Sequence, residues 1–275
     1  MLVTLQGDDV FLESLQEPYK TRCIDQIKKI AEQVDGFIVQ SNFFRDYMAD
    51  YFSIPLDKFY VTPLGINTTD FENFHRTHQP PQEGKQLTIG YLARLAPEKG
   101  LHHLVDAFLE LKTRPNTQHI RLKIAGWLAP EYQAYAQQQF ERLKTAGHED
   151  HFEYLGAIER KAKLEFLKNI DVFSVPTQFK EPKGLYILEA LAAGVPVVVH
   201  QHGAFPELVG ESTGGILTPP ENPPVLADAI LRLLEDHELR NETGIAGQRY
   251  VFQQRNATKM AEVTSQAIEA FFQKQ

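Results

Sequence analysis

The amino-acid sequence predicts an α/β protein built on a doubly wound parallel sheet. Short apolar runs recur along residues 87–217, and segments with a helical spacing of apolar residues separate them. The same alternation occupies residues 1–65 on a smaller scale. Strands that alternate with helices pair in parallel through right-handed crossovers, which place ligands at the carboxyl ends of the strands. The loops that follow the strands are therefore where chemistry is expected.

The first elements are predicted from local signals. Ile24, Ile27 and Ile30 recur at helical spacing, and Ser41 and Asn42 are capping candidates for the next helix. The expected elements are an opening strand that ends in a turn, a helix at 18–32, a strand at 36–39, a helix from the caps to Phe52, and a strand at 59–61. The following residues, 63–81, turn polar and rich in proline, which is typical of a linker.

The second part of the chain repeats the alternation over a longer stretch. One further helix is marked at its start, because Asn222 is an N-cap residue and Pro223 suits the first helical position. Strands are expected at 87–93, 121–125, 152–155, 171–175, 195–199 and 215–217, and helices at 101–112, 131–146, 160–169, 185–193, 223–235 and 257–272.

Composition excludes several classes of protein. Apolar residues make up 43% of the 275 residues and charged residues 23%, which indicates a folded protein. The formal charge of −8 argues against general nucleic-acid binding, which depends on Lys and Arg. The single cysteine, Cys23, excludes an internal disulfide and fits a reducing cytosol. The longest apolar run, 188–199, is too short and too interrupted to cross a bilayer, and the first residues lack the basic start of a signal peptide. A cytoplasmic location is therefore expected.

Two cations flank the turn that follows the strand at 87–93. Arg94 stands at the carboxyl end of this strand, and Lys99 lies just before the next helix. Both side chains are placed to reach one anion that also interacts with the helix N-terminus. The alternative is an ordinary solvated loop, since Lys and Arg are common on surfaces.

A second candidate motif places an acidic residue inside an apolar helix. Glu189 is flanked by apolar residues on both sides, and a buried carboxylate without a partner is costly. A ligand with a pair of hydroxyl groups, such as a ribose diol, would satisfy it. Gly184, at the helix start, would let backbone amides approach a phosphate closely. The alternative is that Glu189 forms a cap or pairs with a neighbouring helix.

Taken together, these segments resemble glycosyltransferase family 4 (group 1), a set of retaining enzymes with the two-domain GT-B fold. The two glutamates of a Glu-x7-Glu pattern are Glu181 and Glu189. The match runs in order over the segments 35–41, 61–67, 94–99, 124–126, 154–156, 181–189, 203–209 and 214–217. The Glu-x7-Glu pattern alone is weak, but this order and spacing are specific. The fold implied is a Rossmann-like C-terminal domain plus a partial N-terminal α/β domain.

The resemblance implies a catalytic set of Glu181, Arg94 and Lys99. Arg94 and Lys99 would clamp the donor diphosphate and neutralise the leaving nucleotide. Glu181 would lie beside the transferred sugar, and Glu189 would hold the ribose hydroxyls. Members of the family generally need no metal, so neither a metal nor another cofactor is expected. His102, His103, His200 and His202 are accordingly interpreted as structural or surface residues.

The remaining donor-binding residues follow from the same resemblance. The amides of Gly184 and Leu185 would contact phosphate or sugar hydroxyls, and loops near Gly126 and Ile158 would line the base. Many relatives have Gly-Phe after the first glutamate, whereas this chain has Pro182 and Lys183. Lys183 adds a positive charge that can meet an anionic sugar or phosphate.

The resemblance also implies a domain organisation. Residues 1–70 are interpreted as the last part of the N-terminal, acceptor-side domain, 71–86 as the linker, and 87–250 as the sugar-nucleotide-binding domain. Residues 251–275 would form a C-terminal helix that packs back toward the N-terminal domain. The first part of the N-terminal domain is expected to be missing, and any peripheral membrane contact would be made through it.

The predicted function is retaining transfer of a hexose from a nucleotide-diphosphate sugar. UDP-, GDP- and ADP-sugars are not distinguished, and the acceptor can be a saccharide, a lipid or a small molecule. One alternative is a non-catalytic nucleotide-sugar-binding module or inactive fragment. A second, less favoured because of the Glu181 and Glu189 pair, is a UDP-sugar epimerase.

Overall fold

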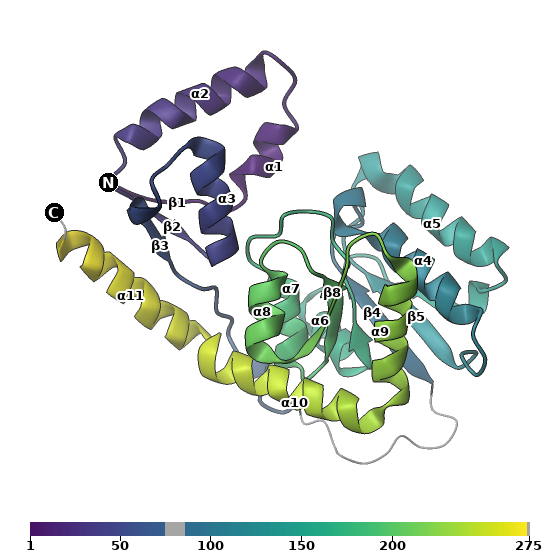
Figure 1. The fold of residues 1–275 in the computed structure, drawn as a ribbon. Helices are drawn as coiled ribbons and strands as arrows, with labels where there is room; N and C mark the ends of the chain where they lie inside the picture. The colour runs from purple at the N-terminus through teal and green to yellow at the C-terminus, as the bar shows by residue number, and fades with distance from the viewer. Residues whose placement is uncertain (75–85, 274–275) are drawn as a thin grey trace.

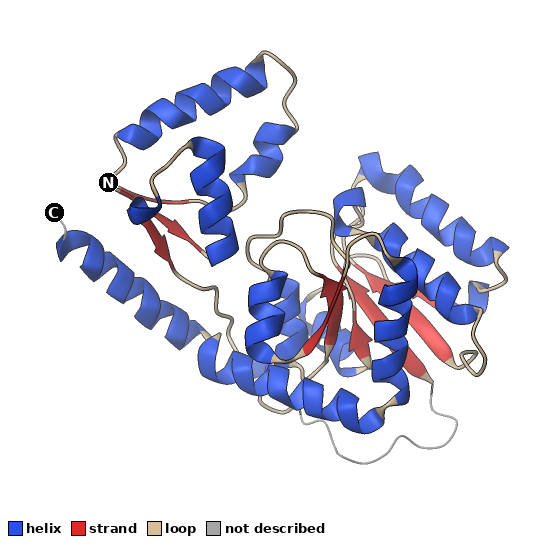
Figure 2. Cartoon of the chain, in the orientation of Figure 1, coloured by secondary structure: helices blue, strands red, loops and turns tan. Residues whose placement is uncertain are grey.

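The computed structural model describes residues 1–74 and 86–273, and it confirms the α/β class (Figure 1). Two parallel sheets are present in this part of the chain, one of three strands and one of six (Figure 2). The expected linker, 71–86, lies largely outside the described residues. Each sheet has its own buried apolar cluster.

The smaller sheet and its helices form what we call the N-terminal unit, residues 1–61. Its strands are β1 (Leu2–Thr4), β2 (Gly36–Val39) and β3 (Phe59–Val61), in that order, and its helices are α1 (Asp8–Glu13), α2 (Tyr19–Glu32) and α3 (Asn42–Phe52). Helix α3 begins where the sequence predicts, because the Ser41 hydroxyl accepts a hydrogen bond from the amide of Phe44 at 3.2 Å. The short helix α1 was not predicted; the sequence indicated only a turn there.

The larger sheet belongs to what we call the C-terminal unit, residues 86–254. Its strands are β4 (Leu87–Leu92), β5 (Ile120–Ala125), β6 (Phe152–Tyr154), β7 (Val172–Phe173), β8 (Val197–His200) and β9 (Gly215–Thr218). Their order is β6-β5-β4-β7-β8-β9, so the direction of winding reverses between β4 and β7. A reversal of this kind opens a crevice at the carboxyl ends of the two strands. The residues that follow β4 and β7 include Arg94, Lys99 and Glu181.

Helices cover both faces of the larger sheet (Figure 2). They are α4 (Leu101–Lys112), α5 (Gln133–Thr145), α6 (Arg160–Lys168), α7 (Leu185–Ala192), α8 (Phe205–Ser212), α9 (Pro223–Glu235) and α10 (His237–Gln254), and α11 (Ala257–Gln273) follows them. Helices α8 and α10 were not predicted. Helix α10 gives little periodic signal because its buried positions include Arg240, Asn241, Gly244 and Gly247. None of the helices in the described ranges is both long and apolar enough to cross a membrane.

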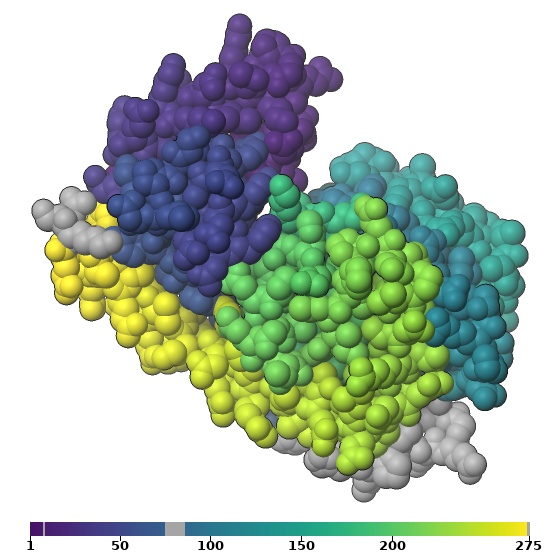
Figure 3. Space-filling view, in the orientation of Figure 1, coloured from purple at the N-terminus to yellow at the C-terminus, as the bar shows by residue number. Residues whose placement is uncertain are grey.

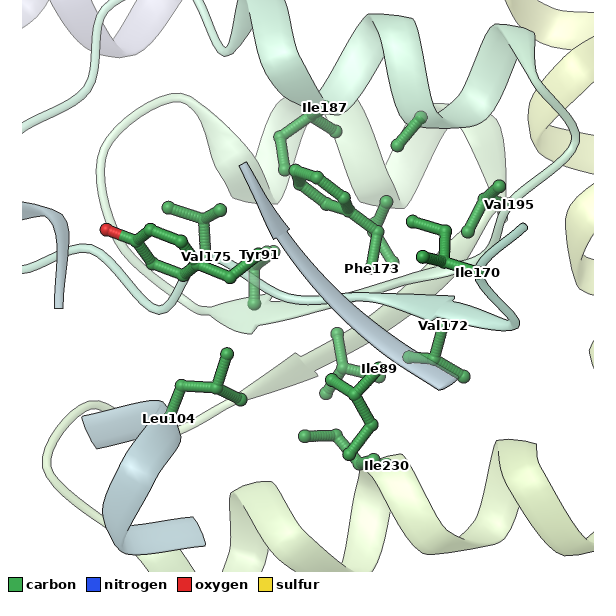
Figure 4. Packing of buried hydrophobic residues seen from close by; sticks show 14 of the residues in the cluster. Ile89, Tyr91, Leu104, Ile170, Val172, Phe173, Val175, Ile187, Val195 and Ile230 are labelled. Carbon is green, nitrogen blue, oxygen red and sulfur yellow. The ribbon is translucent and has the colours of Figure 1, made fainter. Parts of the chain in front are cut away.

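The core of the C-terminal unit is made by strand residues that are buried on both faces (Figure 4). Ile89 and Tyr91 of β4 and Phe173 of β7 are fully buried. Ile187 of α7 lies beside Phe173 on one face of the sheet, and Ile230 of α9 lies beside Ile89 on the other. Such continuous burial is expected of a parallel sheet with helices on both faces. The reversal point is therefore rigid, and the loops beyond it start from fixed positions.

Helices α10 and α11 connect the two units along one side of the molecule (Figure 1). Helix α10 packs on α7 and α8, and it runs through the expected boundary at 250–251. Near the end of α11, the ring of Phe271 packs edge-on against Tyr60 of β3, with centroids 6.1 Å apart. The last helix thus contacts the N-terminal sheet.

Candidate functional site

The centre of the candidate site is a buried ion pair between Lys99 and Glu181. Lys99 closes a short 3₁₀ turn, Pro97–Lys99, and Glu181 lies in the loop after β7. The Nζ of Lys99 is 2.7 Å from Oε2 of Glu181, and the two side chains are 11% and 10% exposed. The rings of Phe179 and Tyr186 flank the ammonium, with centroids at 5.2 and 5.3 Å. The two predicted residues are thus brought together, 82 positions apart.

Several neighbours fix the carboxylate of Glu181. The hydroxyl of Tyr186 donates to Oε2 at 3.2 Å, and the amide of Gly184 approaches Oε1 at 3.4 Å. The Glu181 backbone is held as well, because its carbonyl accepts from the amide of Ala204 at 2.9 Å. Burial and the nearby Glu181 charge raise the pKa of Tyr186 well above its usual value, which keeps this phenol protonated as a donor. The carboxylate also lies at the N-terminus of α7, where a negative charge is favoured, because Gly184 is the N-cap of this helix.

Arg94 lies near this pair but points to a different partner. Its guanidinium donates to the carboxylate of Glu98 at 3.0 Å, and its side chain is 50% exposed. The Tyr91 hydroxyl donates to the Arg94 carbonyl at 3.2 Å, so the backbone of this turn is tied to the core. The exposed side chain is free to turn toward an anion, because surface ion pairs of this kind are worth at most about 1 kcal/mol.

Glu189 is paired with a neighbouring helix, which is the alternative left open by the sequence. Its carboxylate forms an ion pair with Lys163 of α6, and its side chain is 15% exposed. A cavity of about 250 Å³ adjoins the pair, between α6, α7 and the segment 65–71. Its lining consists of Gly65, Ile66, Asn67, Phe71, Arg160, Lys163, Leu164, Leu185 and Glu189.

The other predicted donor-binding residues are spread around this centre. Gly126 follows β5, and its amide donates to the Gly156 carbonyl at 2.9 Å. Ile158 lines a separate surface hollow beside α6, so the structure does not place it in the cavity of Glu189. The ammonium of Lys183 is 2.7 Å from the side-chain oxygen of Gln6, so it contacts the N-terminal unit.

Sequence reasoning missed four residues that shape the site. Lys163 pairs with Glu189, Glu98 pairs with Arg94, and Phe179 and Tyr186 enclose the Lys99 ammonium. Glu98 carried a signal, since it lies four positions after Arg94. The contacts of Lys163, Phe179 and Tyr186 depend on how separate elements pack.

Three of the histidines form a packed group: His102, His103 and His200. The rings of His102 and His103 lie 4.0 Å apart, and His103 and His200 lie 5.3 Å apart. His103 also contacts the side-chain amide of Gln178 at 2.6 Å. Nowhere in residues 1–74 or 86–273 do three His, Cys, Asp or Glu residues form a group that could hold a metal ion.

Burial of His200 makes the stability of the fold sensitive to acid. Its side chain is 1% exposed, and its Nδ1 has no hydrogen-bond partner among the described residues. Burial lowers its pKa to about 4. As the pH falls below about 6.5, this imidazole takes up a proton in the unfolded chain, whereas in the folded chain it stays neutral until about pH 4. The free energy of unfolding should therefore fall by up to about 3 kcal/mol between pH 6.5 and 4.

Urea titrations at several pH values measure this slope. His200→Leu should make this slope shallower but not remove it, because burial also lowers the pKa of His102 and His103. His119→Leu, which removes an exposed histidine, should keep the slope. An equal slope in wild type and His200→Leu would contradict this account of the buried imidazole.

Comparison with known proteins places this chain in a family. The family model described as glycosyl transferases group 1 matches residues 73–250. An uncharacterized glycosyltransferase of Methanocaldococcus jannaschii is 29% identical over 212 residues, which are 74% of this chain and 52% of that protein. The GDP-mannose-dependent α-(1-6)-phosphatidylinositol monomannoside mannosyltransferase of Mycobacterium tuberculosis is 25% identical over 235 residues, which are 82% and 59% of the two proteins. The chain thus spans about half the length of the curated relatives it matches.

Solved structures agree on the fold. HepE of Anabaena, in complex with UDP and glucose, superposes with a TM-score of 0.77 at 20% identity. The superposition covers 98% of this chain and 70% of that one. The fold is therefore of the GT-B type, and the chain belongs to the glycosyl transferases group 1 family.

Proposed function

We propose that this chain supplies the donor half of a retaining family 4 glycosyltransferase that uses a nucleoside-diphosphate sugar. The observation that carries the proposal is the buried Lys99 and Glu181 pair at the point where the winding of the sheet reverses. A cation and a carboxylate held side by side can receive a diphosphate and a sugar hydroxyl, respectively. The names of two related proteins support the donor class, since one is a complex with UDP and glucose and the other is GDP-mannose-dependent.

The chemistry proposed is transfer of a hexose with retained anomeric configuration. The bond between the anomeric carbon and the phosphate oxygen breaks, and a bond to the acceptor oxygen forms on the same face. Lys99 and Arg94 stabilise the negative charge that develops on the leaving diphosphate, so no metal is needed. The leaving phosphate oxygen takes the acceptor proton.

Donor binding is expected to rearrange the ion pairs. Glu181 holds Lys99 and Glu98 holds Arg94, so each cation has a carboxylate partner before the donor arrives. The diphosphate would draw Arg94 away from Glu98, and Lys99 would then contact both the diphosphate and Glu181. The Glu181 carboxylate could in turn accept a hydrogen bond from a sugar hydroxyl. Glu189 would likewise exchange part of its contact with Lys163 for the ribose diol.

Titration calorimetry with UDP, GDP and ADP tests this assignment. We expect one nucleotide to bind wild type, and Glu189→Gln to weaken it about fivefold or more, because a hydrogen bond to a charged group is lost. Glu235→Gln, on the distant helix α9, is the control and should bind as wild type does. Failure of all three nucleotides to bind wild type would refute the proposed donor site.

A further inference from the structure

The carboxylate of Glu207 joins the two units of the molecule. Glu207 lies in the first turn of α8, in the C-terminal unit, and its partners are at the start of α3, in the N-terminal unit. Oε1 accepts from the backbone amide of Phe43 at 2.5 Å. Oε2 accepts from the backbone amide of Asn42 at 3.0 Å and from its side-chain amide at 3.2 Å. One carboxylate thus satisfies free amides of the first turn of an 11-residue helix, where a negative charge is favoured.

The same face of the N-terminal unit also contacts the loop that carries Glu181. The Ser41 hydroxyl donates to the carbonyl of Pro182 at 3.0 Å, and this contact is buried. On one side of it, the ammonium of Lys180 lies 4.0 Å from the ring centre of Tyr47 in α3. On the other side, Lys183 reaches the N-terminal unit through Gln6. In the space-filling view, the dark blue part of the N-terminal unit lies against green residues of the C-terminal unit (Figure 3).

Backbone contacts link the Glu207 helix to Glu181 itself. The amide of Ala204, just before α8, donates to the Glu181 carbonyl at 2.9 Å. Gly203 packs so closely that a Cβ there would lie 2.7 and 2.8 Å from the amide nitrogen and carbonyl oxygen of Glu181. The start of α8 is therefore bonded and closely packed to the Glu181 loop, and Glu207 links α8 to α3.

We propose that Glu207 is a positioning residue that couples docking of the N-terminal unit to the placement of Glu181. With the Glu207 contacts made, α3 and its N-cap Ser41 hold residues 180–183 against the C-terminal unit, and the Glu181 carboxylate meets Lys99. Without them, the loop loses this support and exchanges among conformations. The meaning of the coupling for sugar transfer rests on the proposed function, whereas the coupling itself does not.

Hydrogen exchange of the whole chain, without nucleotide, tests the coupling. Glu207→Ala should speed exchange of peptides covering residues 178–184 and 41–46 by about tenfold or more, because hydrogen bonds to a charged group are lost. Glu207→Gln keeps one acceptor oxygen and should fall between Ala and wild type. The control is Glu211→Ala on the same helix, which loses contacts to Tyr250 and Arg255 but none to α3. It should leave both peptides protected as in wild type.

Each result decides a separate point. Unchanged exchange of residues 178–184 in Glu207→Ala would overturn the coupling, as would an equal increase in Glu211→Ala. Faster exchange spread over β4 and β5 in Glu207→Ala would also overturn it, because a general loss of stability would then be the cause. If the local effect appears but wild type binds no nucleoside diphosphate, the coupling stands and the proposed function fails.

Discussion

Lys99→Met should lower the free energy of unfolding by about 3 kcal/mol, because it leaves the Glu181 carboxylate buried without its cation. Methionine keeps most of the length and apolar surface of lysine, so the packing against Phe179 and Tyr186 is largely retained. The same change should abolish measurable binding of a nucleoside diphosphate, since the buried cation at the phosphate position is gone. Urea unfolding and calorimetry measure the two effects separately.

Two further variants separate the structural effect from the binding effect. Lys99→Met combined with Glu181→Leu removes both charges, so most of the lost stability should return while nucleotide binding stays absent. Arg94→Met removes a half-exposed cation, and it should change stability by less than about 1 kcal/mol yet weaken nucleotide binding about tenfold. If the double variant were as unstable as Lys99→Met, an unpaired charge would not explain the loss.

The sequence predicted elements best where a period and a cap agree. Strand β2 and helix α3 fall where expected because an apolar run is followed, after Gln40, by the N-cap Ser41. Helix α10 was missed because it packs Gly247 against Leu191 of α7 and Gly244 against Gly194 in the following turn, and because it buries the charged side chain of Arg240. The Arg240 guanidinium donates to the carbonyls of Leu233 and Leu234 at the end of α9. A pattern of apolar residues cannot reveal a helix that is held by small residues and by such bonds.

For the site, the sequence indicated which residues carry chemistry but not their partners. Lys99 and Glu181 were both singled out, yet their direct contact depends on the crossover that places β7 beside β4. The expected burial of Glu189 required a partner for its carboxylate, and the sequence allowed either a ligand or a neighbouring helix to supply one. The structure shows that the partner is Lys163 of α6. Glu207 lay within the family resemblance without an assigned role, because its partners in α3 lie 164 and 165 positions away.

Gly126→Ala should lower the free energy of unfolding by about 3 kcal/mol or more. We expect it to be the most destabilising glycine-to-alanine change in the loops that follow the strands of the larger sheet. Gly126 has a φ of 139°, a backbone angle that residues with a Cβ rarely adopt. An added Cβ would also overlap the carbonyl oxygen of Ala93, the residue after β4. Backbone at the end of two paired central strands cannot move aside without breaking the ladder, so strain and overlap add.

Gly147→Ala is the matched control for this change. Gly147 also has positive φ, 79°, but an added Cβ there meets no heavy atom within 4 Å in the part of the chain that the structure describes. It should therefore cost only the backbone strain, about 1–2 kcal/mol. Thermal and urea unfolding of both variants measure the difference, which combines the overlap with Ala93 and the greater backbone strain at φ 139°. Equal losses in the two variants would mean that the β4 and β5 loops do not approach so closely. Contact with the donor base would then be the remaining reason for a glycine at position 126. A larger loss of stability in Gly126→Ala instead shows that this glycine has a structural role, in the backbone that positions Arg94.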